Sequence, residues 1–155
     1  MAREIMERRA AENTYLHKDF HGALNHGMIY LQSHFGDEAV REWLRDFTRQ
    51  WHAPLRQRLA AGDLDALRRH LEDLHRSEGV AIACEQSPEA LVVRVPACPA
   101  VSTLRQRGEA ICSLFVETTR TVNEALCEGT PFQAELLAYD PATGASLQRF
   151  SRRTP

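Results

Sequence analysis

Apolar residues in the first half of the chain recur every three or four positions, which is the spacing of one face of an α-helix. The first set lies between about Thr14 and Phe35, and Gly36 follows as a helix-ending residue. The apolar stripe of this segment consists of Phe20, Leu24, Met28, Leu31 and Phe35. The pattern predicts a long helix that turns one apolar face toward the interior.

Two or three further helical segments are predicted before Gly79. Asp37 is a suitable N-cap for the first of them, and Pro54 either kinks that helix or begins a new one that ends at Gly62. Asp63 then caps the last segment, which continues to about residue 78. The apolar positions between Asp37 and Pro54 are Val40, Trp43, Leu44, Phe47 and Trp51.

After Gly79 the apolar period changes to two, which is typical of β-strands. Alternating residues around Ile82 and the run Leu91–Val95 flank Ser87-Pro88-Glu89, so this stretch is predicted to be a hairpin. The remaining expected elements are helices over 99–107 and 109–127 and strands over 132–139 and 145–151.

The order of these elements predicts an α+β domain. An N-terminal helical bundle, residues 1–78, precedes a ββααββ half, residues 79–151, whose antiparallel sheet is backed by helices. With 155 residues, 43% hydrophobic and 26% charged, the composition is that of a single globular domain over 1–155. A homodimer suits a domain of this size, although no residue specifies one.

The formal net charge of -2 offers no electrostatic attraction for nucleic acid or an acidic membrane surface. The sequence has no apolar run long enough to span a membrane and no secretory signal, so we expect a cytoplasmic protein without nucleic-acid or membrane partners. In a reducing compartment the four cysteines are expected to be free thiols.

Two pairs of polar residues interrupt apolar helix faces. His17 and His21, one helical turn apart, lie on or beside the stripe of the first helix, and His75 and Glu78 extend the stripe of the last N-terminal helix. If the two helices run antiparallel, these side chains meet and can bind zinc, iron or manganese as a Lewis acid or as the activator of a bound water. The alternative is hydrogen bonding within the core without a metal.

Surface positions are expected for His26, His34, His52 and His70.

Cys98 stands between a predicted strand and Pro99, at the N-terminus of a predicted helix. There the helix dipole and free amides favour a thiolate, so Cys98 is a candidate nucleophile; the alternative is a small buried residue at a turn. Asn25 continues the histidine side of the first helix and can orient a substrate or, alternatively, satisfy backbone groups within a packed helix.

A set of residues in the second half resembles the L-2-amino-thiazoline-4-carboxylic acid hydrolase family: Cys98-Pro99, Leu104, Gly108 and Ile111-Cys112-Ser113-Leu114-Phe115. The layout after Gly79 also resembles vinyl-reductase-type domains, whose helices and antiparallel sheet enclose a small-molecule pocket. Over about 80–150 the resemblance implies hydrolysis of a C–N bond in a cyclic amidine or related heterocycle. It implies a divalent metal and makes Cys98 and Cys112 the catalytic candidates. The cysteine expected near the last strand is absent from Gly144-Ala145-Ser146-Leu147-Gln148.

Three functions remain open at this point. The first is a metal-dependent enzyme with Cys98 near the substrate and with the ligands His17, His21, His75 and Glu78. The second is a noncatalytic small-molecule-binding or sensor domain that uses a pocket between the helices and the sheet. The third is an interaction subunit in which Trp43, Phe47 and Trp51 form a partner-facing stripe instead of part of the core.

Overall fold

The computed structural model describes residues 14–154, with side chains described from Lys18 onward, and these residues form six helices and four strands. The helices are α1 (Thr14–Phe35), α2 (Asp37–Trp51), α3 (Ala53–Ala60), α4 (Leu64–Ser77), α5 (Pro99–Gln106) and α6 (Glu117–Cys127). The strands are β1 (Ala83–Gln86), β2 (Ala90–Val95), β3 (Phe132–Tyr139) and β4 (Ser146–Arg152). Helices precede a ββααββ part, so the predicted α+β class is confirmed.

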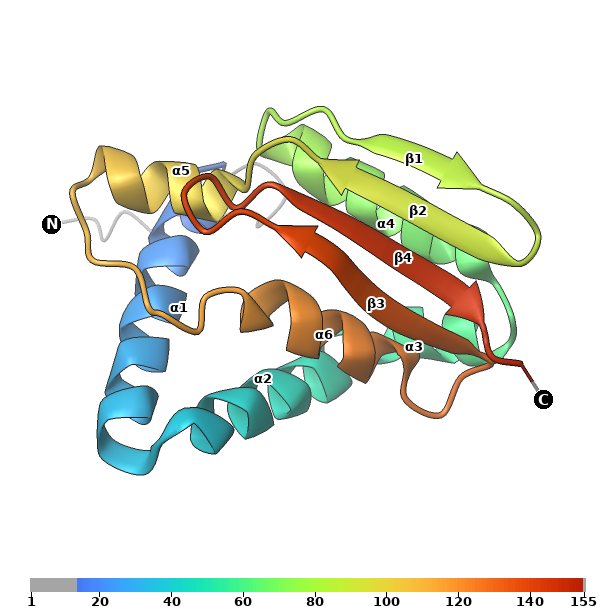
Figure 1. Ribbon diagram of the computed structural model, residues 1–155, viewed down its shortest axis with the longest axis horizontal. Coiled ribbons are helices and arrows are strands. Elements are labelled where there is room, and N and C mark those ends of the chain that lie inside the picture. Colours follow the sequence, from blue (N-terminus) through green and yellow to red (C-terminus); the bar gives the residue numbers. More distant parts are fainter. Residues whose placement is uncertain (1–13, 155) are drawn as a thin grey trace, which may run out of the picture.

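The four strands form one antiparallel sheet in the order β1-β2-β4-β3 (Figure 1). Each hairpin pairs its own two strands, and the hairpins join where β2 pairs with β4, with Leu91 opposite Phe150 and Val93 opposite Gln148. Side chains alternate between the two faces of a strand, so Val93 is buried while the next residue, Arg94, is exposed. The period-two pattern therefore determines which face of the sheet packs against the helices.

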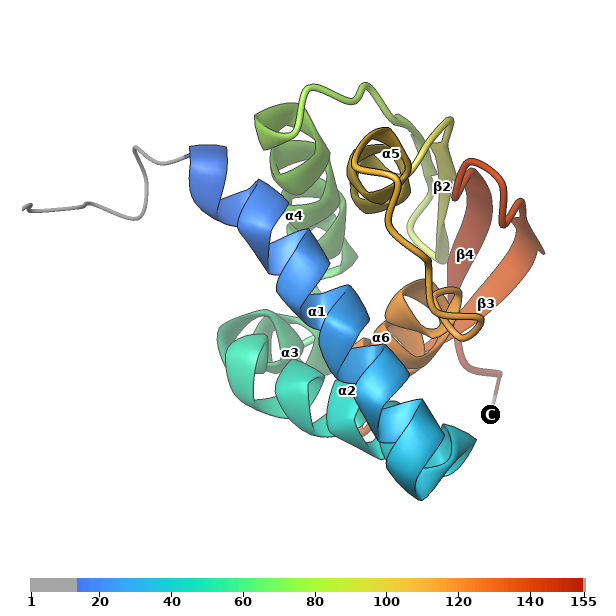
Figure 2. The same ribbon diagram turned by 90° about the vertical axis from the view of Figure 1, so that its left-hand side faces the viewer.

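The helices lie on one side of the sheet (Figure 2), and two apolar clusters fill the space between them. Residues of the first, between the sheet and α3, α4 and α6, include Leu59, Leu67, Leu91, Phe132 and Phe150. Residues of the second, which involves α1, α2 and α5, include Met28, Val40, Leu44, Leu104 and Phe115. Burial of these side chains is the main contribution that holds the helices to the sheet.

Turn and capping residues place the helix ends close to where the sequence predicts them. Gly36 separates α1 from α2 with a φ of 87°, in the left-handed region that favours glycine. The side chain of Asp63 accepts a hydrogen bond of 3.0 Å from the amide of Ala66 at the start of α4. Pro54 lies in the first turn of α3, so a new helix begins there.

Two predicted elements start later than expected. The helix predicted from residue 109 begins only at Glu117, and the strand predicted from residue 80 begins at Ala83. For the helix the cause is a long-range contact, because the side chain of Asn25 bonds the Ala110 carbonyl and the Cys112 amide. Those two backbone groups are therefore used in holding the segment against α1, and the helix starts beyond them.

Candidate functional site

His21 and Glu78 come together although they are far apart in sequence. The Nε2 atom of His21 lies 3.0 Å from Oε1 of Glu78, and their side chains are 14% and 9% exposed. The contact joins α1 to the C-terminal end of α4, so the two helices that carry the predicted metal ligands do meet. Half of the predicted ligand set is therefore in direct contact.

The other two predicted ligands are less closely tied to this contact. His75 is half-buried, and its Nδ1 atom lies 2.8 Å from the Leu71 carbonyl oxygen within α4, which leaves Nε2 as the ring atom for a ligand role. His17 belongs to α1, but its side chain lies outside the described residues. Among side chains from Lys18 to Thr154, no group of three histidine, cysteine or acidic residues is placed to hold a metal ion.

Cys98 occupies the predicted position at the start of α5. Its amide donates a hydrogen bond of 3.0 Å to the Thr143 carbonyl, so the β3–β4 loop lies against the helix end. The loop approaches closely at Gly144, where an added Cβ would collide with the Cβ of Cys98 and lie 2.9 Å from Cγ2 of Val101. Glycine is therefore required where the loop meets the side chains of Cys98 and Val101.

The Cys98 thiol is more strongly held in its protonated form than the sequence suggests. Burial raises its pKa, and the negative charge of Glu78 acts in the same direction. The amides of Ala100 and Val101 favour the thiolate, as expected at a helix N-terminus, but burial outweighs them. The expected thiolate-stabilising environment is thus present but is overcome by desolvation.

Asn25 and Cys112 form part of a buried contact between α1 and the segment before α6. The Asn25 side chain is fully buried, donates a hydrogen bond of 2.8 Å to the Ala110 carbonyl and accepts one of 2.9 Å from the Cys112 amide. The Cys112 thiol is buried as well and lies 3.4 Å from Oε1 of Gln32. For Asn25 this geometry corresponds to the packing alternative, since its polar atoms contact the protein itself.

A row of aromatic side chains lies on the outer side of the α1–α2 pair. We call it the aromatic patch and define it as Phe20, Trp43, Phe47 and Trp51. The Phe47 ring centroid lies 6.1 Å from those of both Phe20 and Trp51. Trp51 is 74% exposed and Phe20 45% exposed, and Trp43 packs over Gly27 of α1, where an added Cβ would lie 3.2 Å from its ring. The buried face of α2 instead consists of Val40, Leu44 and Thr48.

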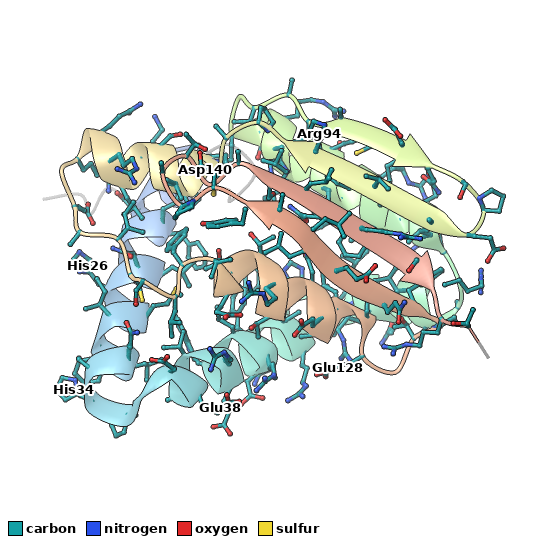
Figure 3. The ribbon with its side chains drawn as sticks, viewed as in Figure 1. His26, His34, Glu38, Arg94, Glu128 and Asp140 are labelled. Carbon is teal, nitrogen blue, oxygen red and sulfur yellow. The ribbon has the colours of Figure 1, made fainter. Side chains whose placement is uncertain are left out.

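Two histidines beside the aromatic patch are not on the open surface, which corrects the sequence expectation for them. His52 and His70 are half-buried and their rings meet edge to face with centroids 5.2 Å apart. Burial, together with the neighbouring His70, lowers the pKa of His52 to about 4, and burial also lowers the pKa of His70. His26 and His34 are exposed as predicted, on α1 (Figure 3).

The surface has hollows at one face of α2 and at one end of the sheet. One follows the outer face of α2 and is lined by Glu42, Arg45, Asp46 and Arg49. The other, of about 350 Å³, lies at the end of the sheet beside Arg94 and Asp140 (Figure 3). Tyr139 lines this second hollow, and burial raises its pKa to about 12, so its hydroxyl stays protonated at neutral pH.

Comparisons with protein-family models and with curated proteins find no match for this chain. Within residues 14–154, no helix is both long and apolar enough to cross a membrane. The function is therefore inferred from the geometry of the described residues.

Proposed function

We propose that this chain is an interaction subunit that pairs with a second copy of itself through the aromatic patch. The observation that carries the proposal is the exposure of Trp51, which leaves 74% of its surface in water while its ring stacks on Phe47. Large aromatic side chains are enriched at protein interfaces, where their burial supplies much of the binding energy.

Trp51, the most exposed member of the aromatic patch, is not part of the interior of the subunit. The buried residues of α2 are Val40, Leu44 and Thr48, and Trp51 is not among them. Phe20 on α1 extends the same surface, so the patch spans two helices instead of being one isolated exposed ring. A contiguous exposed apolar surface of this kind is typical of an association site.

A second copy is the partner that the composition of the patch favours. Its four side chains, those of Phe20, Trp43, Phe47 and Trp51, carry no charge. A twofold interface brings the same surface of both subunits together, so that surface has to be complementary to itself. A patch of uncharged aromatic rings meets this condition, whereas a surface with charges of a single sign does not.

Sedimentation velocity over a range of protein concentrations tests this function. We expect the wild-type chain to form dimers as concentration rises and Trp51→Ala to shift the equilibrium toward monomer. The matched control is Leu137→Ala, because Leu137 is 50% exposed but lies on β3. A wild-type chain that stays monomeric, or an equal loss of dimer in both variants, would overturn the proposal.

A metal-dependent hydrolase is the second candidate, and the His21–Glu78 contact favours it. Nitrogen and oxygen ligands of a tetrahedral zinc ion lie about 3.3 Å apart, given bond lengths of about 2.0–2.1 Å. The 3.0 Å between Nε2 of His21 and Oε1 of Glu78 is close to this spacing. His75 and His17 are the remaining proposed ligands, and the bound metal would supply a Lewis acid for cleaving a C–N bond of a cyclic amidine.

Metal content measured by mass spectrometry, on protein purified without chelating resin, tests the second candidate. We expect near-stoichiometric zinc, iron or manganese in the wild type and its loss in His21→Ala and in His17→Ala. His26→Ala is the control on the same helix, since His26 is exposed. Protein that is metal-free, folded and unaffected by added zinc or manganese would exclude this function.

A further inference from the structure

His52 and His70 differ from the other histidines whose side chains the structure describes. The rings of those others each lie near a polar protein atom: His21 near Glu78, His26 near Glu109, His34 near the Tyr30 carbonyl and His75 near the Leu71 carbonyl. Within the described residues, neither His52 nor His70 forms a hydrogen bond or an ion pair. Both are half-buried, so protein side chains surround part of each ring. Their ring nitrogens are therefore available to another ligand.

The two rings lie close together on different helices. His52 stands at the junction of α2 and α3, and His70 belongs to α4. Their ring centroids are 5.2 Å apart, and the ring planes make an angle of 83°. In a tetrahedral site with metal–nitrogen bonds of about 2.0–2.1 Å, the centroids of two bound imidazole rings lie about 5 Å apart. The two rings therefore already have the separation of two ligands on one metal ion.

The packing of α3 on α4 maintains this separation. Leu59 of α3 and Leu67 of α4 are both fully buried in the same apolar cluster. The turn between the two helices is held as well, because Asp63 accepts hydrogen bonds from the amide of Ala66 and from the guanidinium group of Arg58. Since the backbone that carries both rings is fixed, bringing them to one metal ion requires little additional ordering.

Both imidazole rings are in the protonation state that a metal ion binds. Burial lowers the pKa of His52 to about 4, and it also lowers the pKa of His70. Neutral rings offer a nitrogen lone pair, so at neutral pH a metal ion does not have to displace a proton. Asp73 is the acidic residue whose charge acts on His70, but it is exposed and lies 2.7 Å from Arg76. Asp73 therefore adds negative charge near the rings without being placed as a third ligand.

We propose that His52 and His70 form a binding site for a divalent transition metal ion of the zinc and nickel type, with water in the remaining coordination positions. Imidazole nitrogen suits these ions, whereas magnesium and calcium prefer oxygen ligands. Both protein ligands belong to one subunit, so the site does not depend on the proposed association. It is also separate from the ligand set that includes His75, because five residues on α4 turn His75 about 140° away from His70.

Two protein ligands hold a metal ion less tightly than three or four, so the site is detected with added metal. Calorimetric titration of the metal-free full-length chain with Ni²⁺, and separately with Zn²⁺, is the test. We expect one saturable site in wild type and its loss in His52→Phe and in His70→Phe, which keep an aromatic ring but have no nitrogen donor. His34→Phe, at an exposed position on α1, is the matched control and should bind as wild type does.

A measurement on the wild type alone does not depend on how well the variants fold. On addition of Zn²⁺, the ring signals of His52 and His70 in the NMR spectrum should shift together, while those of His26 and His34 stay in place. Added Mg²⁺ should shift none of them. Zn²⁺ should also raise the melting temperature of wild type, because it binds the folded state.

Three results would overturn the proposed metal site. The first is a wild-type chain that shows neither saturable binding nor shifted signals of His52 and His70. The second is a site that survives in one of the two phenylalanine variants, since the pair would then not be the ligand set. The third is binding that is lost in His21→Ala and kept in His70→Phe, which would assign the metal to the contact with Glu78 instead.

Discussion

The aromatic residues of this chain fall into two groups with opposite environments. Phe132 and Phe150 are fully buried between the sheet and the helices, whereas Phe20 and Trp51 are 45% and 74% exposed on the outer side of α1 and α2. Both groups arise from sequence patterns that predict apolar faces. The comparison shows that an apolar pattern specifies which residues share a face, while the neighbouring elements decide whether that face becomes interior.

Helix α2 illustrates the difference within one element. Its apolar positions follow two parallel series with a spacing of four residues, one that includes Val40 and Leu44 and one that includes Trp43, Phe47 and Trp51. Neighbouring series on a helix are separated by about 100°. Only the first series is buried, so the second remains at the flank of the helix, next to α1.

Removing a buried ring is expected to have the largest effect on stability. In Phe150→Ala the side chain opposite Leu91 and Ala134 at the centre of the sheet is lost, which leaves a cavity in the core. We expect the free energy of unfolding to fall by about 3–5 kcal/mol, measured by urea denaturation. A loss below about 1 kcal/mol would show that the buried aromatic residues do not stabilise the fold as expected.

Asn25→Ala is expected to have the next largest effect. The substitution removes the amide side chain that holds the 110–112 segment. The Ala110 carbonyl then loses its donor and the Cys112 amide loses its acceptor. We expect a loss of about 2–4 kcal/mol in urea denaturation. The control is Gln32→Ala, which removes a more exposed contact to Ser113 in the same region and should cost less than about 1 kcal/mol. Unchanged stability of Asn25→Ala would favour the substrate-binding alternative instead.

Local signals account for the parts of the structure that the sequence predicts well. Gly36, Asp63 and Pro99 mark helix ends through φ preference, capping and the missing amide hydrogen, and these effects act within a few residues. The alternation in β2 likewise reports the burial of one face. The α+β class and the order of elements could therefore be predicted from single segments.

The parts that the sequence could not place depend on contacts over long separations. The start of α6 is shifted by Asn25, which is more than eighty residues away, and the half-burial of His52 depends on His70 in α4. For the candidate site, the pattern indicated that α1 and the end of α4 carry polar groups on inner faces. It also indicated that these groups meet if the two helices run antiparallel. It could not indicate that His21 and Glu78 are the pair in direct contact, because the packing of α1 on α4 is not encoded in either helix alone.

The pH dependence of stability tests the half-buried residues His52 and His70, which are neither fully buried nor fully exposed. The pKa of His52 is lowered to about 4 in the folded state from an ordinary value near 6.5, so the unfolded state binds more protons between these values. Stability is therefore fully present above about pH 6.5 and decreases as pH falls toward 4. Asp73 opposes the lowering of the pKa of His70, and His75 adds to it.

The variant that tests this pH effect is His70→Gln, which removes one lowered pKa and the charge that acts on His52. We expect a smaller loss of stability between pH 6.5 and 4 than in wild type, measured by urea denaturation at a series of pH values. His26→Gln, at an exposed position, should keep the wild-type slope. If His70→Gln keeps that slope as well, the histidine pair is not the source of the acid sensitivity.

The smallest effect on stability is expected for Trp51→Ala, although it removes the largest side chain considered. Because 74% of the Trp51 surface is already in water, its loss should change the free energy of unfolding by about 0.5 kcal/mol or less at concentrations where the protein is monomeric. At higher concentrations the wild type should gain stability from dimer formation by mass action, and the variant should not. Thermal unfolding followed at several concentrations separates these regimes. A Trp51→Ala variant that is strongly destabilised as a monomer would place Trp51 with Phe150 as a residue of the fold, and the contrast between the two aromatic groups would be lost.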